Sequence, residues 1–443
     1  MKLTLIKPNI GRMEHSLYVD EGRMEPLQLG VLAGMTPPEF EIRLWDDRCE
    51  AIDCEEATDL VCITVETYTA RRAYEIADDY RERGVPVVLG GFQVTLFPEE
   101  SQKHADAICI GDAESVWLDI LSDAEAGTLK PVYRGVPALA QRGTLPRREI
   151  FHGKGYLPVT LVQFTRGCPY PCHFCAISAV SEQTYTTRPV EEVVREIEAQ
   201  ERRFVFFVDD NIIANRARAK ELFRALIPLR IRWVSQGSIN MTHDRELMDL
   251  MAGSGCLGNV IGFESLQPDS LTEMKKAPNM GKYQERYAKE VAVLKEYGLQ
   301  TWAAFTLGHD HDTPESLYDL LDFAFEHSFC FAAYNILMPY PGTPLYHKLK
   351  AESRLLYDGA WWLHPEYRFN HAAFIPKNMA PDELTGICFD IRSRWNSLPG
   401  MMRRFLDIKT NMRSLRKMGI FWRYGLLYRK ETFKKQGMFF GKK

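Results

Sequence analysis

The sequence lacks several features that would assign it to a common class of proteins. It has no run of about 18 consecutive apolar residues, which a transmembrane helix requires, and only LTLI separates Lys2 from Lys7, which is too short for the apolar region of a signal peptide. We therefore expect a cytoplasmic protein. No G-x-G-x-x-G follows the first predicted strand, which disfavours dinucleotide binding. Motifs for nucleic-acid binding are absent too, and the net charge of −4 argues against a nucleic-acid partner.

Length and composition indicate a globular protein with several domains. The chain has 443 residues, of which 45% are hydrophobic and 26% charged, and this excludes a disordered or collagen-like chain. Because single hydrophobic cores stop growing near about 250–300 residues, we expect two large units and a smaller third one. The ten cysteines of a cytoplasmic protein are expected to be buried thiols or metal ligands rather than disulfides.

The negative net charge conceals a basic C-terminal segment. Residues 401–443 contain thirteen Lys and Arg against two Asp and Glu, interspersed with aromatic side chains. A segment of this kind suits a membrane surface or an anionic partner, or else a helix that packs on the body and leaves its basic side in solvent. We favour the packed helix and keep peripheral membrane contact through the basic C-terminal tail as the alternative.

The first 135 residues alternate short β-rich runs with helical stretches. Strands are expected at 2–6, 41–45, 59–65, 85–91 and 105–111, and the clearest helices at 26–35, 70–84 and 114–124. Apolar strands separated by helices indicate a parallel sheet that is covered on both faces. Residues 1–135 are therefore predicted to form a doubly wound α/β domain, a fold that binds ligands at the carboxyl ends of its strands.

Polar or glycine-rich segments follow three of these strands, where a ligand would lie. Paired glycines let a flat ligand come close to the backbone, although a glycine after a strand is more often just part of a turn. The candidate binding residues in these segments are Thr64, Thr67, Tyr68, Gly90, Gly91, Phe92, Gln93, Gly111 and Glu114.

The most specific motif is Cys168-x-x-x-Cys172-x-x-Cys175, directly after a β-like run at 159–165. Three thiolates so closely spaced can hold three irons of a 4Fe-4S cluster and leave the fourth iron open to another ligand. A zinc site would usually need a fourth protein ligand, and His173 lies inside the spacer. We predict an iron–sulfur cluster with an open iron, which indicates that the cluster takes part in a reaction. The other cysteines are expected to be buried thiols, with Cys388 standing alone in the C-terminal region.

With Phe174 before its third cysteine, this motif resembles the signature of radical S-adenosylmethionine (SAM) enzymes, in which SAM binds the open iron. Later runs resemble the strands of the family's barrel, at 204–211, 232–238, 259–265, 301–313 and 334–349. The resemblance implies a linker at 136–157, a radical SAM partial (β/α)6 barrel at 158–350 and a mainly helical C-terminal region at 351–443. It implies SAM contacts at Phe174, Asp209, Asp210, Gln236, Ser238 and Glu264. From the residues alone, Asp210 or Asn211 could equally cap a helix.

The first domain resembles the cobalamin-binding domain found before many radical SAM barrels, on its PLQLGVLAGM, GGFQVTLFPEE and IGDAESVW segments. Many such domains carry D-x-H-x-x-G, whose histidine ligates cobalt, but residues 46–51 here read DDRCEA. The guanidinium of Arg48 stays protonated and has no lone pair for a metal. The resemblance thus implies cobalamin bound near Arg48 and the candidate residues of this domain, without a histidine ligand from this motif.

Together the two resemblances imply a cobalamin-dependent radical SAM enzyme that methylates an unactivated carbon of a small-molecule, tetrapyrrole, lipid or natural-product substrate. The same architecture also serves radical ring formation, ring contraction or oxidation without methyl transfer, and the motifs do not separate these reactions. A cobalamin beside a radical generator favours methyl transfer. A flavodoxin or ferredoxin is the implied electron donor. A non-enzymatic sensor is disfavoured because it needs no open iron. The polar-aromatic stretch 361–371 either closes the barrel mouth or packs beneath it.

Overall fold

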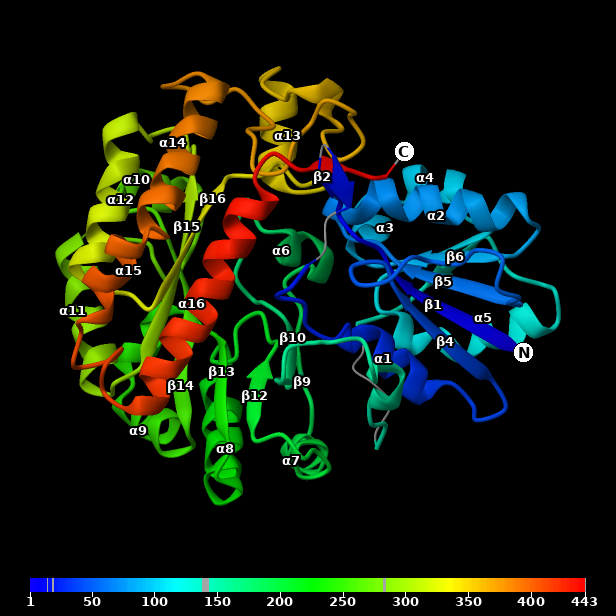
Figure 1. Ribbon diagram of the computed structural model, residues 1–443, viewed down its shortest axis with the longest axis horizontal. Helices are drawn as coiled ribbons and strands as arrows, with labels where there is room; N and C mark the ends of the chain where they lie inside the picture. The colour runs from blue at the N-terminus through cyan, green and yellow to red at the C-terminus, as the bar shows by residue number, and fades with distance from the viewer. Residues whose placement is uncertain (14, 18–19, 138–142, 282–283, 443) are drawn as a thin grey trace.

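The computed structural model describes residues 1–13, 15–17, 20–137, 143–281 and 284–442. Two parallel α/β units lie side by side, with the N-terminal unit on the right of Figure 1 and the second unit on the left. Part of the predicted linker, residues 138–142, lies outside the described residues.

The N-terminal unit is built on a six-stranded parallel sheet in the order β4-β1-β5-β6-β7-β8. Its strands are β1 (Lys2–Lys7), β4 (Glu41–Asp46), β5 (Leu60–Thr64), β6 (Val87–Gly90), β7 (Ala107–Ile110) and β8 (Val132–Arg134). Its helices are α1 (Leu27–Met35), α2 (Ala70–Glu82), α3 (Phe92–Leu96), α4 (Pro98–Ser101) and α5 (Trp117–Glu125). The predicted doubly wound sheet is confirmed.

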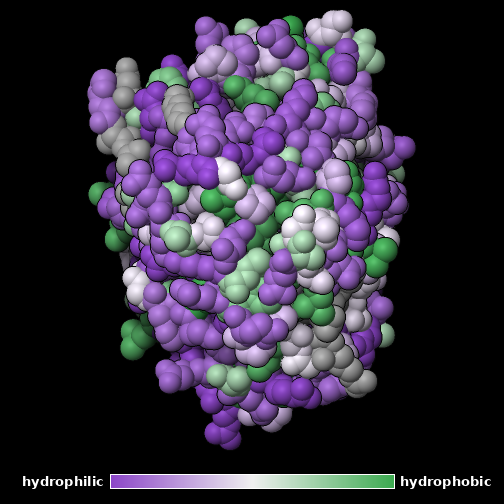
Figure 2. All heavy atoms as spheres, turned by 90° about the vertical axis from the view of Figure 1, so that its right-hand side faces the viewer, coloured by the Kyte–Doolittle hydropathy of each residue, from purple (hydrophilic) through white to green (hydrophobic). Residues whose placement is uncertain are grey.

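Both faces of this sheet are buried, as the apolar character of the strands predicts. Leu3 and Leu60 pack into a core with α1 and α5, whereas their neighbours Ile6 and Val61 pack into a second core with α2. The strand order reverses beside β1, which is the place where doubly wound sheets bind ligands. The outer side of this unit is mostly hydrophilic (Figure 2).

The second unit contains a single open parallel sheet in the order β16-β15-β14-β13-β12-β9. Its strands are β9 (Thr160–Val162), β12 (Phe204–Phe207), β13 (Arg232–Gln236), β14 (Cys256–Glu264), β15 (Gln300–Leu307) and β16 (Phe331–Ile336). Its helices are α7 (Val190–Glu198), α8 (Arg216–Leu226), α9 (Arg245–Gly253), α10 (Pro268–Glu273), α11 (Gln284–Glu296), α12 (Pro314–Glu326) and α13 (Pro344–Ala351). Six strands with helices on one side confirm the predicted partial (β/α)6 barrel.

The C-terminal region is mainly helical, as predicted. It comprises α14 (Pro381–Trp395), α15 (Leu398–Phe405) and α16 (Leu415–Lys435). Figure 1 shows α16, in red, crossing in front of the barrel sheet. The chain then returns to its beginning, because β17 (Phe439–Phe440) pairs antiparallel with β2 (Gly11–Met13), which also pairs with β3 (Ser16–Leu17). This small sheet was not predicted, since strands of two or three residues carry little periodicity.

The stretch 361–371 packs between the two units rather than closing the barrel mouth. Trp361, Trp362 and Tyr367 are fully buried in the core that also contains α2. The indole of Trp362 donates a hydrogen bond to Glu100 Oε1 (2.9 Å), so this segment joins the units directly. Among the described residues, no helix is both long and apolar enough to cross a membrane.

Candidate active site

The cysteine motif occupies a tight loop between β10 (Thr165–Gly167) and α6 (Ala176–Ser181). β10 pairs antiparallel with β11 (Tyr185–Thr187), so the loop and α6 are held at both ends. Gly167 has φ +82°, and a Cβ there would lie 2.2 Å from the carbonyl oxygen of Thr184, so only glycine fits at the entry to the loop. Inside the loop, the Cys175 amide donates a hydrogen bond to the Cys172 carbonyl oxygen (3.2 Å).

The three thiols are half-buried and free, and burial raises the pKa of each, that of Cys172 to about 12. In the part of the chain that the structure describes, no three His, Cys, Asp or Glu side chains converge closely enough to hold one metal ion. Three half-buried thiols on one loop fit a 4Fe-4S cluster, in which each thiolate binds a different iron. Iron would also deprotonate thiols that are otherwise protonated at neutral pH.

A largely buried ion pair lies beside these thiols. Lys276, after α10, contacts the carboxylate of Glu264, the last residue of β14, which has the left-handed φ of +66°. The Lys276 ammonium opposes the effect of burial on the thiol pKa of Cys172 and Cys175. Sequence reasoning predicted Glu264 but missed Lys276, because two lysines after a short helix look like an ordinary surface segment.

Asp209 and Asp210 follow β12 and face different partners. Asp209 is fully buried and accepts the backbone amides of Phe164 (3.2 Å) and Thr165, so it fixes the segment between β9 and β10. Burial raises the pKa of Asp209 to about 7. Asp210 instead accepts the Gly167 amide (3.1 Å) at the start of the cysteine loop. Neither residue caps a helix.

Of the other predicted SAM contacts, Gln236 is half-buried at the end of β13 and Ser238 is buried two residues later. The Asn211 amide donates a hydrogen bond to the Ser238 hydroxyl (2.6 Å), which couples the ends of β12 and β13. Phe174 packs against the barrel core, with its ring 6.4 Å from that of His309. The structure therefore gathers Asp210, Glu264 and the three cysteines at one end of the barrel. Each of Asp209, Asp210, Ser238 and Glu264 has a polar partner within the protein.

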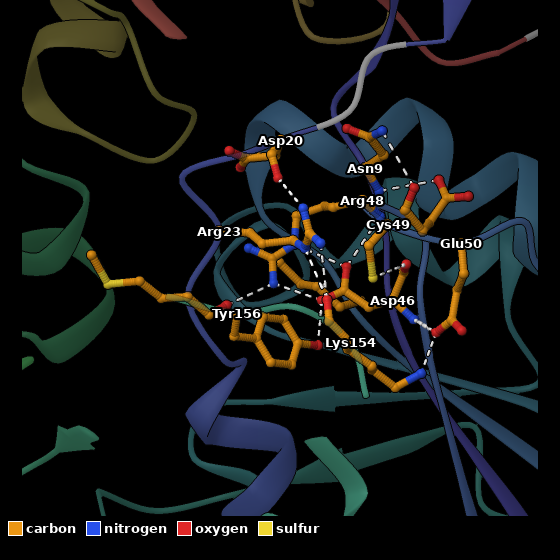
Figure 3. A network of polar contacts seen from close by, with 12 residues as sticks. Asn9, Asp20, Arg23, Asp46, Arg48, Cys49, Glu50, Lys154 and Tyr156 are labelled. Atoms are coloured by element: carbon orange, nitrogen blue, oxygen red, sulfur yellow. Dashed lines mark hydrogen bonds and ion pairs between the residues drawn. The ribbon is translucent and has the colours of Figure 1, made fainter. Parts of the chain in front are cut away.

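In the segment that would carry a cobalt-ligating histidine, the polar side chains bind each other and neighbouring protein groups (Figure 3). The Arg48 guanidinium binds both carboxylate oxygens of Asp46, at 2.9 and 2.7 Å, and donates to the Met24 carbonyl oxygen (2.8 Å). The Tyr156 hydroxyl donates to the same carboxylate (2.7 Å). Asp46 is buried and Arg48 is half-buried, and their pairing fixes the arginine toward Asp46. Arg48 is therefore held by protein groups.

The other candidate cobalamin residues divide into two groups. Thr64, Gly90, Gly91, Phe92 and Gly111 lie at the ends of β5, β6 and β7, with Phe92 43% exposed. The remaining residues are engaged in packing or polar contacts, namely Thr67, Tyr68, Gln93 and Glu114.

The residues of this second group are held by contacts within the protein. Tyr68 packs against the rings of Trp361 (5.2 Å) and Phe440 (5.7 Å), and the buried Gln93 donates a hydrogen bond to Glu100 (3.0 Å). Gly91 has φ +116°, and a Cβ there would lie 2.6 Å from the Val65 carbonyl oxygen, so the fold itself requires this glycine.

An ion-pair bridge joins the two units beside the cysteine loop. Arg166, in β10, pairs with Glu114 (2.5 Å) and Asp112 (3.2 Å), which follow β7 of the N-terminal unit. The carboxyl ends of the N-terminal strands therefore face the cysteine loop. The half-buried backbone at Gly90 and Gly91 and the exposed Phe92 fit a large flat cofactor that receives no protein ligand from residues 46–51.

Comparisons with known proteins agree with this architecture. The radical SAM superfamily matches residues 162–324. Bacteriochlorophyllide d C-8(2)-methyltransferase of Chlorobaculum tepidum is 30% identical over 369 residues, covering 77% of this chain and 80% of that protein. Bacteriochlorophyllide d C-12(1)-methyltransferase of the same bacterium is 29% identical over 397 residues, covering 86% of this chain and 84% of that protein.

A solved structure shares the fold of both units. The radical SAM methyltransferase TsrM from Kitasatospora setae, solved with cobalamin and a 4Fe-4S cluster bound, has a TM-score of 0.64 and 19% sequence identity, covering 79% of this chain and 75% of that chain. The partial barrel and the preceding doubly wound unit thus occur together in this solved structure as well. The chain therefore belongs to the radical SAM superfamily, with the bacteriochlorophyllide methyltransferases among its relatives.

Proposed function

We propose that this enzyme transfers a methyl group from SAM to an unactivated carbon of a tetrapyrrole. The observation that carries the proposal is the joining of two units through Arg166, which sets the strand ends of the N-terminal unit opposite the cysteine loop. Both relatives described above are named as methyltransferases of a bacteriochlorophyllide and align with more than three quarters of this chain.

The roles of the residues follow from their positions. Cys168, Cys172 and Cys175 would hold the cluster, whose chemistry when bound is to cleave SAM by one-electron reduction. Glu264 and Lys276 offer opposite charges beside it, suited to the amino and carboxylate groups of SAM. Gln236 would contact SAM at the end of β13. Asp209 and Asp210 position the cysteine loop through the backbone of β10.

A methyl carrier would bind the N-terminal unit at Thr64, Gly90, Gly91, Phe92 and Gly111. The engagement of Arg48 with Asp46 supports a cobalamin without a nitrogen ligand from residues 46–51. The electron-paramagnetic spectrum of bound Co(II) should therefore show no nitrogen coupling to cobalt. Such coupling, or an absence of any cobalamin affinity in the reconstituted protein, would contradict this part of the proposal.

The reaction balances with two SAM molecules and two electrons per turnover. One SAM gives its methyl group and leaves S-adenosylhomocysteine. The other accepts an electron and the hydrogen atom of the substrate C–H bond, and leaves methionine and 5′-deoxyadenosine. A reduced flavodoxin or ferredoxin of the cytoplasm would supply the electrons. Equal yields of S-adenosylhomocysteine and 5′-deoxyadenosine are expected, whereas 5′-deoxyadenosine alone, with an oxidised or cyclised product, would indicate the reaction without methyl transfer.

The basic C-terminal segment supports both a packing role and a membrane contact. Near its end it pairs with acidic residues of the N-terminal unit, as Lys430 of α16 does with Glu21 (2.7 Å) and Lys442, after β17, does with Asp47 (2.6 Å). By contrast, the connection between α15 and α16, taken together with the first turn of α16, leaves apolar side chains in solvent, with Leu406 64%, Ile408 75% and Leu415 85% exposed. Lys409, Arg413 and Arg416 are exposed in the same connection.

Apolar and basic side chains together suit the surface of an anionic membrane, and we propose that this connection makes the peripheral contact. Changing Leu406, Ile408 and Leu415 to Ser should release the protein from vesicles of anionic lipid in a sedimentation assay. The same changes at Ile227 and Met280, which are exposed elsewhere, serve as the control. Equal sedimentation of all proteins would leave only the packing role.

A further inference from the structure

The inner face of the barrel sheet borders a cavity of about 380 Å³. Along each strand, side chains that point outward are fully buried under the helices, such as Val205, Phe207 and Trp233. The alternating side chains that point inward remain half-buried and form an apolar wall of Phe204, Phe206, Val234, Val260, Trp302 and Phe331. The interior of this barrel is therefore not filled by its own side chains, and its volume lies within the roughly 300–1,000 Å³ range of ligand sites.

Helix α16 crosses the barrel sheet (Figure 1), and its residues line the side of the cavity that faces the sheet. Its Tyr424 ring lies 6.4 Å from Phe204 and its Tyr428 ring 5.4 Å from Trp302. The Tyr428 hydroxyl also donates a hydrogen bond to the Ala332 carbonyl oxygen of β16 (3.2 Å). The helix therefore forms a fixed apolar wall opposite the sheet.

One cation lines the cavity without an anionic partner. Arg392, in α14, is 8% exposed and reaches around the edge strand β16, where it donates to the Tyr334 carbonyl oxygen (2.6 Å) and to Asn335 Oδ1 (2.8 Å). Asn335 lies on the inner face of β16, so the guanidinium is on the side of the cavity. Within the described part of the chain, no carboxylate forms an ion pair with Arg392, although burying an unpaired charge is costly.

The acidic residues that line the cavity already have cationic partners. Glu431 pairs with Lys435 (3.3 Å), and Asp20 is also within 3.7 Å of Lys435. Another buried arginine, Arg404, shows the alternative arrangement, because its guanidinium packs on the Trp395 ring (4.1 Å) and donates hydrogen bonds to the carbonyl oxygens of Trp395 and Cys330. Arg392 differs from Arg404 in facing open space.

We propose that this cavity binds an apolar small molecule that carries a carboxylate, with the carboxylate paired to Arg392 and the apolar body held between the sheet and α16. The proposal names the substrate class and rests on the proposed function. Asn335 lies near the end of β16, so the carboxylate would sit toward the barrel end that carries Glu264 and the cysteine loop. A neutral hydrocarbon would leave the guanidinium unpaired and would bind more weakly.

The test compares two fluorescent probes, 1-pyrenebutyrate and its methyl ester, titrated into the full-length protein without SAM. A buried charge-assisted pair should make the acid bind at least about tenfold more tightly than the ester. Arg392→Gln should abolish this preference, and Arg392→Lys should retain part of it. Arg394→Gln is the matched control, since Arg394 is in the same helix with its side chain 60% exposed and should keep the full preference. Val260→Trp should fill the cavity and weaken the binding of both probes.

Equal binding of acid and ester by the native protein, or unchanged binding by Val260→Trp, would overturn the proposal. The proposal also fails if Arg394→Gln loses the preference as fully as Arg392→Gln does. Because Arg392→Gln could impair folding, thermal unfolding of each variant is measured, and Val260→Trp and Arg392→Lys keep the test decisive. A native protein that selects the acid but makes no methylated product would refute the proposed function alone, since probe binding involves no SAM.

Discussion

Two carboxylate–cation pairs at strand ends show how differently the two units treat buried charge. Asp46 and Arg48 in the N-terminal unit form a bidentate pair that Tyr156 and the Met24 carbonyl oxygen complete. Glu264 and Lys276 in the barrel also pair, but beside three thiols whose pKa values burial raises. The first network is completed by the protein's own polar groups, whereas the second lies beside three free thiols. Polar groups that are fully paired within the protein indicate a structural role, and free thiols beside a buried ion pair indicate a functional one.

The largest loss of activity should come from substitutions of the three cysteines in the barrel. Replacing Cys168, Cys172 or Cys175 by Ala should abolish cluster binding and SAM cleavage, because a three-thiolate site has no spare ligand. Iron analysis after anaerobic reconstitution should fall from about four irons per chain to near none. Cys388→Ala, a buried thiol far along the chain, is the control and should keep cluster and activity. Full iron content in a Cys172→Ala protein would contradict the assignment of these cysteines as cluster ligands.

Removing one partner of the barrel pair should cost stability as well as activity. Lys276→Met leaves the Glu264 carboxylate buried and unpaired, which should lower the free energy of unfolding by about 3 kcal/mol. Lys275→Met, at the exposed neighbour, should change it by less than about 0.5 kcal/mol. Urea denaturation of the two variants measures the difference, and equal stability would show that the pair of Glu264 and Lys276 contributes little to the free energy of unfolding.

The same experiment in the N-terminal unit should give a smaller loss and no change in chemistry. Arg48→Met removes the bidentate partner of Asp46, but Tyr156 remains, so the expected cost is about 2 kcal/mol. Arg83→Met, on an exposed arginine, is its control. The electron-paramagnetic spectrum of bound Co(II) should be the same in Arg48→Met as in the native protein. A changed spectrum would show that Arg48 contacts the cofactor.

The effect of Asp209 should appear in the pH dependence of stability. Burial raises its pKa from 3.8 to about 7 in the folded protein, so the folded state binds a proton more tightly than the unfolded state. Its contribution to stability is therefore full below about pH 4 and is lost as the pH rises to about 7. Asp209→Asn should remove this slope, so the variant should lose less stability than the native protein does between pH 5 and pH 8. Denaturation at pH 5 and pH 8 tests this, and an unaltered slope would contradict the assignment.

Most of the fold could be predicted from sequence because each strand is a compact apolar run followed by a helix. The strands from β1 to β16 in both parallel sheets fall within or overlap the predicted runs, apart from the short edge strand β8. The pairing of β17 with β2 could not be predicted, because it joins two short segments from opposite ends of the chain. The need for glycine at Gly11 is visible only in the folded structure, since a Cβ there would lie 1.8 Å from the Phe439 carbonyl oxygen.

The sequence predicts the candidate site most specifically where its residues are close together in the chain. The cysteine motif is local, and its placement on one loop follows from its spacing. Lys276 and Arg392 lack such a signal, because their importance comes from burial beside Glu264 and from the cavity under α16. Tyr68 and Gln93 were predicted as cofactor contacts from their places near strand ends, and in the structure both make packing or polar contacts within the protein.

The origin of the new carbon in the product tests the central claim most directly. The enzyme, reconstituted with cluster and cobalamin and reduced by flavodoxin, is given SAM deuterated in its methyl group together with a bacteriochlorophyllide substrate. Mass spectrometry should find a product that has gained a fully deuterated methyl group, with S-adenosylhomocysteine and 5′-deoxyadenosine formed in equal amounts. A product that is oxidised or cyclised and carries no deuterium, formed together with 5′-deoxyadenosine, would contradict the account.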